Sequence, residues 1–480
     1  MRICPSGFRE YDVRWRYPDQ IDLEGVQALG MSLGAQLLRR NLGNQIVVGH
    51  DYRSYAPTVK DALVSGLVAS GAHVLDIGLC LSPTAYFAQF HLDVPAVAMV
   101  TASHNPNGWT GVKMGFDRPC THGPTDVLEL RGIVEQSSGR ARAGGRAEQV
   151  SGVQEAYLKD LSQGGPLSRP LRAVVATGNG TAGLFAPELL RRIGVDVIEL
   201  HCNLDHSFPN YNPNPEAVEM QRDMARAVLE TGADLAFGFD GDGDRCGVVD
   251  GKGQAVSSDK LGLLLARAMV ADHPGARFLA DVKSTALFAT DPVLKAAGAH
   301  VEYWKTGHSH MKRRLRDTNG LAAFEKSGHH FLAPPIGRGY DCGLRVAVEL
   351  CRALTMADTV SLADEILGLG QSWISPTMSP HCDDAVKYQV VERLADSFHV
   401  MKEAGHPLAG RRISDILTVN GVRVQLEDGS WALVRASSNT SNLVVVCESL
   451  ISEADLKRLF KDFDEVLYSA PEIGPYDQRL

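Results

Sequence analysis

Long uninterrupted hydrophobic runs are scarce in this chain of 480 residues. The apolar run Leu261 to Val270 is broken by Arg267 and is much shorter than the roughly 20 apolar residues that a membrane-spanning helix needs. The first segment, Met1 to Arg16, carries charge throughout and has no apolar core of the kind that a signal peptide requires. We therefore expect neither a membrane span nor an export signal.

Paired cysteine motifs are also absent. The nine cysteines are scattered, with no CxxC pair and no clustering with histidine at the spacing of a zinc site. Such cysteines are typical of buried thiols in a reducing compartment, so we expect a cytoplasmic protein.

No strong excess of one charge marks the sequence, since its net charge is -9 and its pI is about 6.0. This balance argues against nucleic acid or an anionic membrane as the main partner. A composition of 44% hydrophobic and 22% charged residues is ordinary for a globular protein. The length suits roughly three or four domains.

The densest concentration of charge is the segment DGDGDR at residues 240–245, between the apolar runs Leu235 to Phe239 and Cys246 to Val249. Three carboxylates at alternate positions, separated by glycine, can converge on a hard cation through oxygen ligands. An EF-hand loop is excluded, because its sixth position would be Arg245 and its twelfth Gly251. A solvated acidic turn is the remaining alternative. It does not explain why three carboxylates that repel one another lie so close in sequence with nothing to neutralise their charge.

A strand, helix, strand pattern occurs three times along the chain. Its strands are expected at Ile46 to Val48 and after Gly71, at Ala173 to Ala176 and after Gly194, and at Phe278 to Val282 and after Gly298. Such a pattern is typical of parallel βαβ units and predicts three related α/β domains. A different pattern, strands followed by a helix beginning near Ser452 and Asp455, predicts a smaller fourth domain.

Segments rich in small, turn-forming or proline residues suggest the domain boundaries. Residues 137–152 are rich in Gly, Ser, Arg and Ala, residues 250–253 contain two glycines, and residues 368–382 contain two prolines. We expect domains at residues 1–150, 151–252, 253–370 and 371–480. The predicted fold class is α/β, with three related domains of mixed sheets and a smaller α+β C-terminal domain around a central cleft.

A second chemical motif, TASHNP at residues 101–106, follows the apolar run Val97 to Val100. Ser103 is therefore expected at the carboxyl end of a strand, where open α/β sheets bind ligands. Lys113 lies downstream and adds a cation that could assist phosphoryl chemistry. A turn or helix cap explains the same residues, so the spacing alone leaves both interpretations open.

Six motifs in chain order resemble those of the α-D-phosphohexomutases, the family of phosphomannomutase and phosphoglucomutase. They are FREYDVR at 8–14, TASHNP at 101–106, DGDGDR at 240–245, WKTGHS at 304–309, EKSGH at 325–329 and RASSNT at 435–440. The resemblance covers nearly the whole chain. It implies a mutase that interconverts the 6-phosphate and 1-phosphate of mannose, and of glucose, through a phosphoserine enzyme and a hexose 1,6-bisphosphate, which also serves as activator.

The resemblance also implies roles for individual residues. Ser103 would carry the phosphoryl group, and Mg²⁺ would be bound by Ser103 and the three carboxylates Asp240, Asp242 and Asp244. The residues implied near the transferring group are Arg14, His104, Lys113 and Arg245. Those implied in binding the phosphosugar substrate are Tyr11, Lys283, His308, Glu325, Ser327, His329, Arg435, Ser437, Ser438, Asn439 and Thr440.

The C-terminal motif also has a physical rationale. The guanidinium of Arg435 is a planar donor fork, and the hydroxyl and amide side chains after it suit a phosphate dianion. A mutase needs such an anchor remote from Ser103, because one end of the sugar must be held while the other reacts. By itself, a run of Ser, Thr and Asn is more often a turn.

Sugar preference stays open at this stage. In the family the Glu325 and Ser327 positions contact O3 and O4, where mannose and glucose share their configuration. A phosphoglucosamine substrate is disfavoured, because that subfamily usually has Gln where Lys326 stands. The sequence departs from the common family pattern at Trp15, His50, Phe324, Lys326, Cys342 and Ser441.

The main rival is a dinucleotide-binding oxidoreductase. Residues 178–183 fit GxGxxG after a strand, and Glu199 ends the next strand at the separation of a ribose-binding acid. That interpretation leaves the carboxylate cluster, Ser103 and Arg435 without a function. A non-catalytic phosphosugar-binding protein is a second alternative, and intact Ser103 and carboxylates argue against it.

Overall fold

The computed structural model describes residues 1–356, 361–437 and 440–480, and they form two compact units. Unit 1 comprises Met1–Leu261, His308–Ala323 and Ser327–Glu365, and unit 2 comprises Gly262–Gly307, Phe324–Lys326 and Ile366–Leu480. Among the described helices none combines the length and apolar character needed to cross a membrane.

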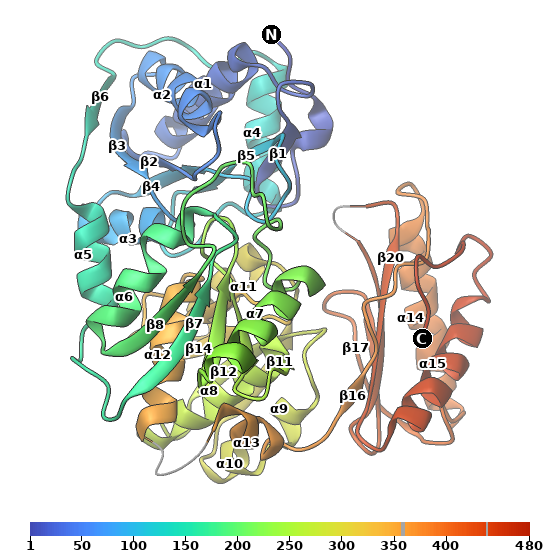
Figure 1. Cartoon of the computed structure of the whole chain (residues 1–480). Coiled ribbons are helices and arrows are strands. Elements are labelled where there is room, and N and C mark those ends of the chain that lie inside the picture. Colours follow the sequence, from blue (N-terminus) through green and yellow to red (C-terminus); the bar gives the residue numbers. More distant parts are fainter. Residues whose placement is uncertain (357–360, 438–439) are drawn as a thin grey trace. The chain divides into compact units, whose positions relative to one another are not determined.

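The first sheet of unit 1 has six strands in the order β1-β5-β4-β2-β3-β6 (Figure 1). The strands are β1 (Val13–Arg16), β2 (Gln45–His50), β3 (His73–Leu79), β4 (Ala96–Val100), β5 (Trp109–Gly115) and β6 (Arg146–Gln149). β5 runs antiparallel to both of its neighbours, whereas β4, β2, β3 and β6 pair parallel. The sheet is therefore mixed, as predicted. Edge strand β6 was not predicted, since it lies in the segment 137–152 that was expected to be a domain boundary. Its four side chains are polar or small and exposed, so they show no buried alternation.

Helices cover both faces of this sheet. They are α1 (Leu23–Arg39), α2 (Ala56–Ala69), α3 (Ser82–His91) and α4 (Pro124–Glu135), followed by α5 (Val153–Leu161). Leu29, Leu63 and Leu130 of α1, α2 and α4 are fully buried in one core with side chains of the strands. Asp22 begins α1, because its side chain accepts a hydrogen bond from the Gly25 amide at 2.8 Å.

The second sheet of unit 1 has the order β11-β10-β9-β7-β8. Its elements are β7 (Leu171–Ala176), η2 (Thr181–Leu184), α6 (Ala186–Arg192), β8 (Val195–Leu200), α7 (Val218–Thr231), β9 (Leu235–Phe239), β10 (Cys246–Asp250) and β11 (Ala255–Val256). β7 pairs parallel with β8 and β9, whereas β9 and β10 form an antiparallel hairpin. The turn of that hairpin carries the three carboxylates.

The third α/β region contains α8 (Ser258–Asp272), β12 (Arg277–Asp281), α9 (Leu287–Thr290), α10 (Pro292–Ala296) and β13 (His300–Trp304). It continues with α11 (His308–Asp317), β14 (Ala322–Phe324), β15 (His330–Leu332), α12 (Gly343–Met356) and α13 (Leu362–Leu367). β12 and β13 pair parallel, as β2 and β3 do and as β7 and β8 do. The three predicted βαβ units are thus confirmed.

Unit 2 also contains an antiparallel sheet in the order β16-β20-β19-β18-β17. Its elements are β16 (Trp373–Ile374), α14 (Lys387–Glu403), β17 (Ile413–Leu417), β18 (Val422–Leu426), β19 (Trp431–Ala436), β20 (Leu443–Ser449) and α15 (Glu453–Leu467). α14 and α15 cover one face of the sheet (Figure 1). The pattern of strands followed by a helix near Ser452 matches β18, β19, β20 and α15, whereas β16, β17 and α14 were not predicted.

The other face of this sheet packs on residues of the third α/β region within unit 2. Trp431 and Leu433 share a core with Val282 and Ala286. Buried Arg423 lies between the rings of Tyr303 and Trp431, at 4.1 and 3.9 Å from their centroids. Its Nη1 donates to the carbonyls of Val282 and Ser284, each at 2.8 Å. Glu448 accepts hydrogen bonds from the Trp431 indole at 2.6 Å, the Thr285 hydroxyl at 2.6 Å and the Ala286 amide at 2.7 Å.

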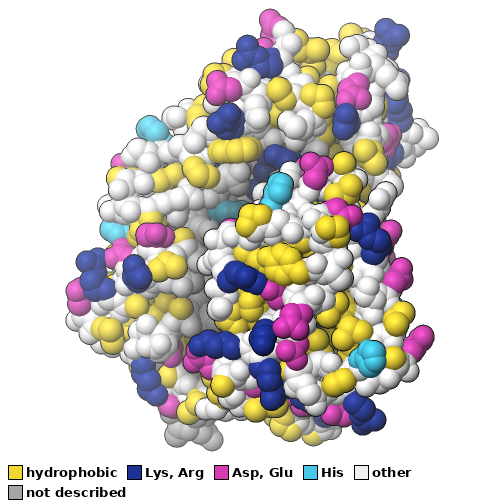
Figure 2. Space-filling model, turned by 90° about the vertical axis from the view of Figure 1, so that its right-hand side faces the viewer, with side chains coloured by type: hydrophobic (Ala, Val, Ile, Leu, Met, Phe, Trp, Pro, Cys, Tyr) yellow, Lys and Arg dark blue, Asp and Glu magenta, His cyan; other side chains and the backbone are white. Residues whose placement is uncertain are grey.

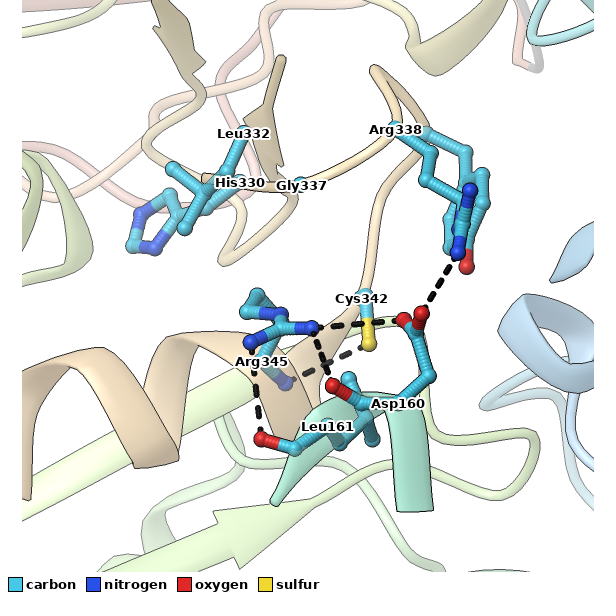
Figure 3. A pocket seen from close by; sticks show the side chains of 9 residues that line it. Asp160, Leu161, His330, Leu332, Gly337, Arg338, Cys342 and Arg345 are labelled. Carbon is cyan, nitrogen blue, oxygen red and sulfur yellow. Dashed lines mark hydrogen bonds and ion pairs between the residues drawn. The ribbon is translucent and has the colours of Figure 1, made fainter. Parts of the chain in front are cut away.

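A small pocket in unit 1 lies beside the start of α12, and His330 of β15 is among its lining residues (Figure 3). Asp160 of α5 holds the opposite wall by accepting from Arg338 at 2.5 Å and from Arg345 at 3.4 Å. The His330 Nε2 lies 3.0 Å from the Ser258 carbonyl. Burial lowers the pKa of His330 to about 4.

This buried histidine makes stability depend on pH. Between pH 6.5 and pH 4 the unfolded chain binds a proton at His330 that the folded chain does not, so stability falls as the pH falls. The shift corresponds to about 3 kcal/mol. We expect His330→Gln to reduce the difference in unfolding free energy between pH 7 and pH 4 by about that amount, as measured by urea titration. The exposed residue His406 supplies a control, His406→Gln, which should keep the wild-type pH dependence. An unchanged pH dependence in His330→Gln would contradict the assignment.

Candidate active site

Ser103 lies in the turn that follows β4. It is 1% exposed and adopts a left-handed backbone conformation with φ of +51°. Its hydroxyl lies 3.0 Å from Oδ2 of Asp240 and 3.4 Å from Nδ1 of His104. Nearby charges from Arg245, followed by burial, hold the pKa of His104 well below its usual range, so its imidazole is neutral. The structure therefore brings the predicted serine together with the predicted acidic loop.

Asp240, Asp242 and Asp244 occupy the turn between β9 and β10 and are fully buried. One carboxylate oxygen from each can be chosen so that all three lie within 4.8 Å of one another. The intervening glycines are required by the backbone. A Cβ on Gly241 would approach the Ser103 carbonyl to 2.6 Å, and Gly243 has a φ of +72°.

These three carboxylates fit a hard divalent cation. Burial, and then repulsion from Asp244 and Asp242, raise the pKa of Asp240 well above its usual range. Oδ1 of Asp242 and Oδ1 of Asp244 are buried and have no hydrogen-bond partner among the described residues. A bound cation would satisfy these oxygens and relieve the repulsion between the acids, and carboxylate oxygens are the ligands that Mg²⁺ prefers.

Lys113 is the positive charge nearest to the acids. It lies on β5 opposite Met99 of β4, and its ammonium group contacts Asp242 at 2.6 Å and also contacts Asp244. Burial raises the pKa of Asp242, but the charge of Lys113 outweighs it, so the pKa lies below the ordinary value. Ser82 of α3 adds a hydrogen bond to Oδ2 of Asp242 at 2.5 Å. Asp242 is thus held in its charged form.

Two arginines flank this cluster. Arg14 of β1 donates to Oδ2 of Asp12 at 2.8 and 2.9 Å and to Oδ1 of Asn105 at 3.1 Å. Arg245 follows the acidic turn directly, and its Nε lies 3.8 Å from Oδ2 of Asp240. Both cations are therefore positioned in unit 1 beside the serine loop and the acidic loop.

A chain of buried polar groups continues from Arg245. Its Nε donates to Nε2 of His329 at 2.9 Å, and Nδ1 of His329 lies 2.9 Å from Asp341, which Lys312 pairs with at 2.6 Å. Because Nε2 of His329 accepts the hydrogen bond from Arg245, Nδ1 is the nitrogen that can donate to Asp341. Near it, burial and then the Lys312 charge hold the pKa of His308 well below its usual range.

Comparison with known proteins identifies the family. Models of the phosphoglucomutase/phosphomannomutase α/β/α domains I, II and III match residues 5–140, 155–253 and 257–366. A phosphomannomutase/phosphoglucomutase of Pseudomonas putida is 34% identical over 98% of this chain and 97% of its own length. The chain belongs to the phosphoglucomutase/phosphomannomutase family.

Other relatives agree with this assignment. A phosphoglucomutase of Neisseria gonorrhoeae is 31% identical over 97% of each chain. The crystal structure of a phosphoglucomutase/phosphomannomutase family protein from Burkholderia thailandensis superposes with a TM-score of 0.89 at 30% identity, covering 99% of this chain and 100% of that one. The family resemblance seen in the sequence is confirmed, and so is the predicted fold class of three α/β domains with mixed sheets and a smaller C-terminal domain. The central cleft stays a prediction.

The remaining family motifs lie partly in unit 1 and partly in unit 2. In unit 1, the Tyr11 ring stands edge-on to His308 at a centroid distance of 4.6 Å, and Ser327 is half-buried. In unit 2, Oε1 of Glu325 accepts from the Gly307 amide at 2.5 Å, and Lys283 lies 3.9 Å from Asp281.

The C-terminal phosphate-loop motif belongs to unit 2. Nη1 of Arg435 at the end of β19 donates to the Ala436 carbonyl at 3.0 Å. Ser437 and Thr440 contact each other through their hydroxyls at 2.9 Å. Ser438 and Asn439 lie outside the described residues. The role of this loop stays a prediction.

Several polar residues of this family member that contact the site were missed by sequence analysis. Glu216 pairs with Arg245 at 3.3 Å, and Asn212 donates to the His104 carbonyl. Both lie in the segment 208–216, whose three prolines and three asparagines were the available signal. Ser82 and Asp341 carried no such local signal, because only the tertiary fold brings them to the acids and to His329.

The GxGxxG segment takes no dinucleotide-binding form. A Cβ on Gly178 would lie 3.0 Å from Pro213, and Asn179 donates to the Asn203 carbonyl at 2.8 Å. Thr181 accepts from the Tyr52 amide at 2.9 Å. Segments of the chain itself therefore contact the loop where a pyrophosphate would have to lie in a Rossmann site, which disfavours the oxidoreductase interpretation.

Proposed function

We propose that the protein is a phosphohexomutase that interconverts mannose 6-phosphate and mannose 1-phosphate, and also the corresponding glucose phosphates. The single observation that carries the proposal is the 3.0 Å contact between the Ser103 hydroxyl and Asp240 in a buried cluster of three carboxylates. Relatives that carry both activities in their names support the choice of substrates.

In the proposed reaction a phosphoryl group moves from phosphoserine 103 to the free hydroxyl of a hexose monophosphate. The P–O bond to Ser103 breaks, a P–O bond to the sugar forms, and the sugar hydroxyl loses the proton that Ser103 regains. The hexose 1,6-bisphosphate then reorients and returns its other phosphoryl group to Ser103. Asp240, Asp242 and Asp244 would hold Mg²⁺, which supplies charge neutralisation at the phosphoryl oxygens.

The side chains around Ser103 provide the rest of the electrostatic environment. Three cations lie beside the serine and acidic loops: Arg14 on β1, Lys113 on β5 and Arg245 directly after the acidic turn. Fixed cations of this kind stabilise negative charge on a transferring phosphoryl group. His104 stays neutral beside the hydroxyl because the two arginines lower its pKa. We assign these four residues to the phosphoryl-transfer step.

Substrate recognition is assigned to the remaining family motifs. The residues assigned to phosphosugar binding are Tyr11, Lys283, His308, Glu325, Ser327, His329, Arg435, Ser437, Ser438, Asn439 and Thr440. The Arg435 loop would bind the phosphate that is not being transferred, and we expect its effect mainly on substrate affinity.

Arg435→Ala tests this assignment. We expect KM for the hexose phosphate to rise by about 10- to 100-fold with a smaller change in kcat, because a charge-assisted hydrogen bond to phosphate is lost in both ground state and transition state. Steady-state kinetics measures both constants. Arg412, whose side chain is 81% exposed in the same unit, gives the matched control Arg412→Ala. An unchanged KM in Arg435→Ala would contradict the role.

The proposed activity is tested by assaying mannose 1-phosphate and glucose 1-phosphate side by side, with Mg²⁺ and the matching 1,6-bisphosphate supplied. Formation of the 6-phosphates is followed by coupled dehydrogenases or by ³¹P NMR. Turnover of either sugar supports a mutase, and the ratio of kcat/KM values gives the preference. No turnover of either sugar by enzyme whose phosphoserine state is verified would overturn the proposal.

We further propose a cytoplasmic location and small phosphosugars as partners. In the described part of the chain all nine cysteines are unpaired, and eight of them are buried. Figure 2 shows positive and negative side chains interspersed over the face that it displays, a pattern without the single-sign field that nucleic acid favours.

A further inference from the structure

Side chains hold both polar backbone groups of Ser103. The Ser103 amide donates to Oγ1 of Thr101 at 2.9 Å. The Ser103 carbonyl accepts from Nη2 of Arg53 at 2.7 Å, and the same nitrogen donates to the Asn105 carbonyl at 2.9 Å. The hydroxyl that faces Asp240 is therefore carried by a peptide segment that is fixed on both sides.

The two contacts converge on one carboxylate. Oδ2 of Asp51 accepts from the Thr101 hydroxyl at 2.8 Å and from Nε of Arg53 at 3.1 Å. The exposed fractions of Asp51, Thr101 and Arg53 are 2%, 3% and 4%. Because the Thr101 hydroxyl donates its proton to Asp51, its lone pair faces the Ser103 amide. The carboxylate thus sets the direction of both contacts.

The conformation of Ser103 explains why such contacts are needed. Its φ of +51° lies in the left-handed region, which residues with a Cβ avoid unless their surroundings impose it. A relaxed backbone at this position would turn the hydroxyl away from Asp240. Buried hydrogen bonds to the amide and the carbonyl of the same residue oppose that relaxation.

We propose that Asp51, Arg53 and Thr101 form a positioning triad that fixes the Ser103 nucleophile in its strained conformation. The inference rests on the proposed function, because it concerns the orientation of the phosphoryl-accepting hydroxyl. None of the three is a ligand of the candidate cation site, and their effect passes through Ser103. Their loss should lower the rate of phosphoryl transfer and leave cation affinity and substrate affinity nearly unchanged.

The first test compares Thr101→Val with Thr101→Ser in the full-length protein. Valine keeps the shape of threonine without its hydroxyl, whereas serine keeps the hydroxyl. Dephosphorylated enzyme is mixed with glucose 1,6-bisphosphate and Mg²⁺, and phosphorylation of Ser103 is followed by quenched flow and intact mass. We expect Thr101→Val to slow this step by about 10²-fold, as small misplacements of a reacting group do. Thr101→Ser should restore most of that loss.

Two measurements separate positioning from loss of structure. Calorimetric titration with Mg²⁺ and KM for the hexose phosphate should each stay within about twofold of wild type in Thr101→Val. Thr231, whose hydroxyl bonds the Ala227 carbonyl within α7, gives the matched control Thr231→Val, which should phosphorylate at the wild-type rate. Arg53→Lys is a second variant, because a lysine keeps the charge but cannot hold Asp51 and both carbonyls together.

The outcomes are distinct. Wild-type phosphorylation rates in Thr101→Val or in folded Arg53→Lys would overturn the positioning triad and leave the proposed function intact. A parallel loss of Mg²⁺ affinity and phosphorylation would also overturn it, because the triad would then support the whole site. Failure of the wild-type enzyme itself to accept a phosphoryl group would overturn the proposed function.

Discussion

Ser103→Ala is expected to abolish mutase turnover, with kcat reduced by at least about 10⁴-fold, because the group that carries the phosphoryl intermediate is removed. The Ser103 hydroxyl is buried, contacts Asp240 and lies beside the acidic turn. Alanine at this position has no hydroxyl that could accept the phosphoryl group. Coupled assays give the rate. Intact mass after incubation with a hexose 1,6-bisphosphate should show phosphorylated wild type and unphosphorylated variant.

A matched control separates this effect from handling or folding. Ser151 is exposed and lies in the same unit, and Ser151→Ala should retain wild-type turnover and phosphorylation. Alanine at position 103 leaves the Thr101 and Arg53 contacts to the backbone possible, so the thermal midpoint should change little. A Ser103→Ala enzyme that turns over at the wild-type rate would refute the mechanism.

Asp242→Asn is expected to have the second-largest effect. The substitution removes a buried negative charge that contacts Lys113 at 2.6 Å and whose Oδ1 has no hydrogen-bond partner among the described residues. A bound cation contributes several kcal/mol to phosphoryl transfer, so we expect kcat/KM to fall by about 10³-fold. Isothermal titration should show weakened Mg²⁺ binding.

Chelation provides an independent measurement of the same site. Treatment of wild type with EDTA should remove activity, and added Mg²⁺ should restore it, whereas Asp242→Asn should recover little. Asp196 on β8 is exposed and pairs with Arg172 at the surface, so Asp196→Asn is the control. Wild-type Mg²⁺ affinity in Asp242→Asn would exclude that carboxylate as a ligand.

The sequence predicted the parts of the fold that repeat a local pattern. Each βαβ unit has a buried strand and a glycine before the second strand, and all three were found as parallel pairs. Edge strand β6 was missed because exposed strands lack buried alternation. α14 was missed because its apolar positions follow a segment that composition marked as a linker.

Candidate site residues that form a contiguous motif could be predicted from the sequence, whereas residues that reach the site from distant segments could not. The DGDGDR turn is contiguous, and steric contact with Ser103 and a left-handed φ explain its glycines. The supporting residues are distant in sequence. Ser82 lies 160 positions from Asp242 and Asp51 lies 50 from Thr101, so only the folded chain shows that they meet.

Arg423 has a consequence for how unit 2 would respond to a bound sugar phosphate. Its guanidinium joins the loop after β12, which carries Lys283, to the sheet whose strand β19 ends at Arg435. Glu448 makes the same connection through Thr285 and Trp431. Lys283 and Arg435 are therefore connected through buried contacts. If a ligand displaced one of these side chains, we expect the buried contacts to displace the other as well.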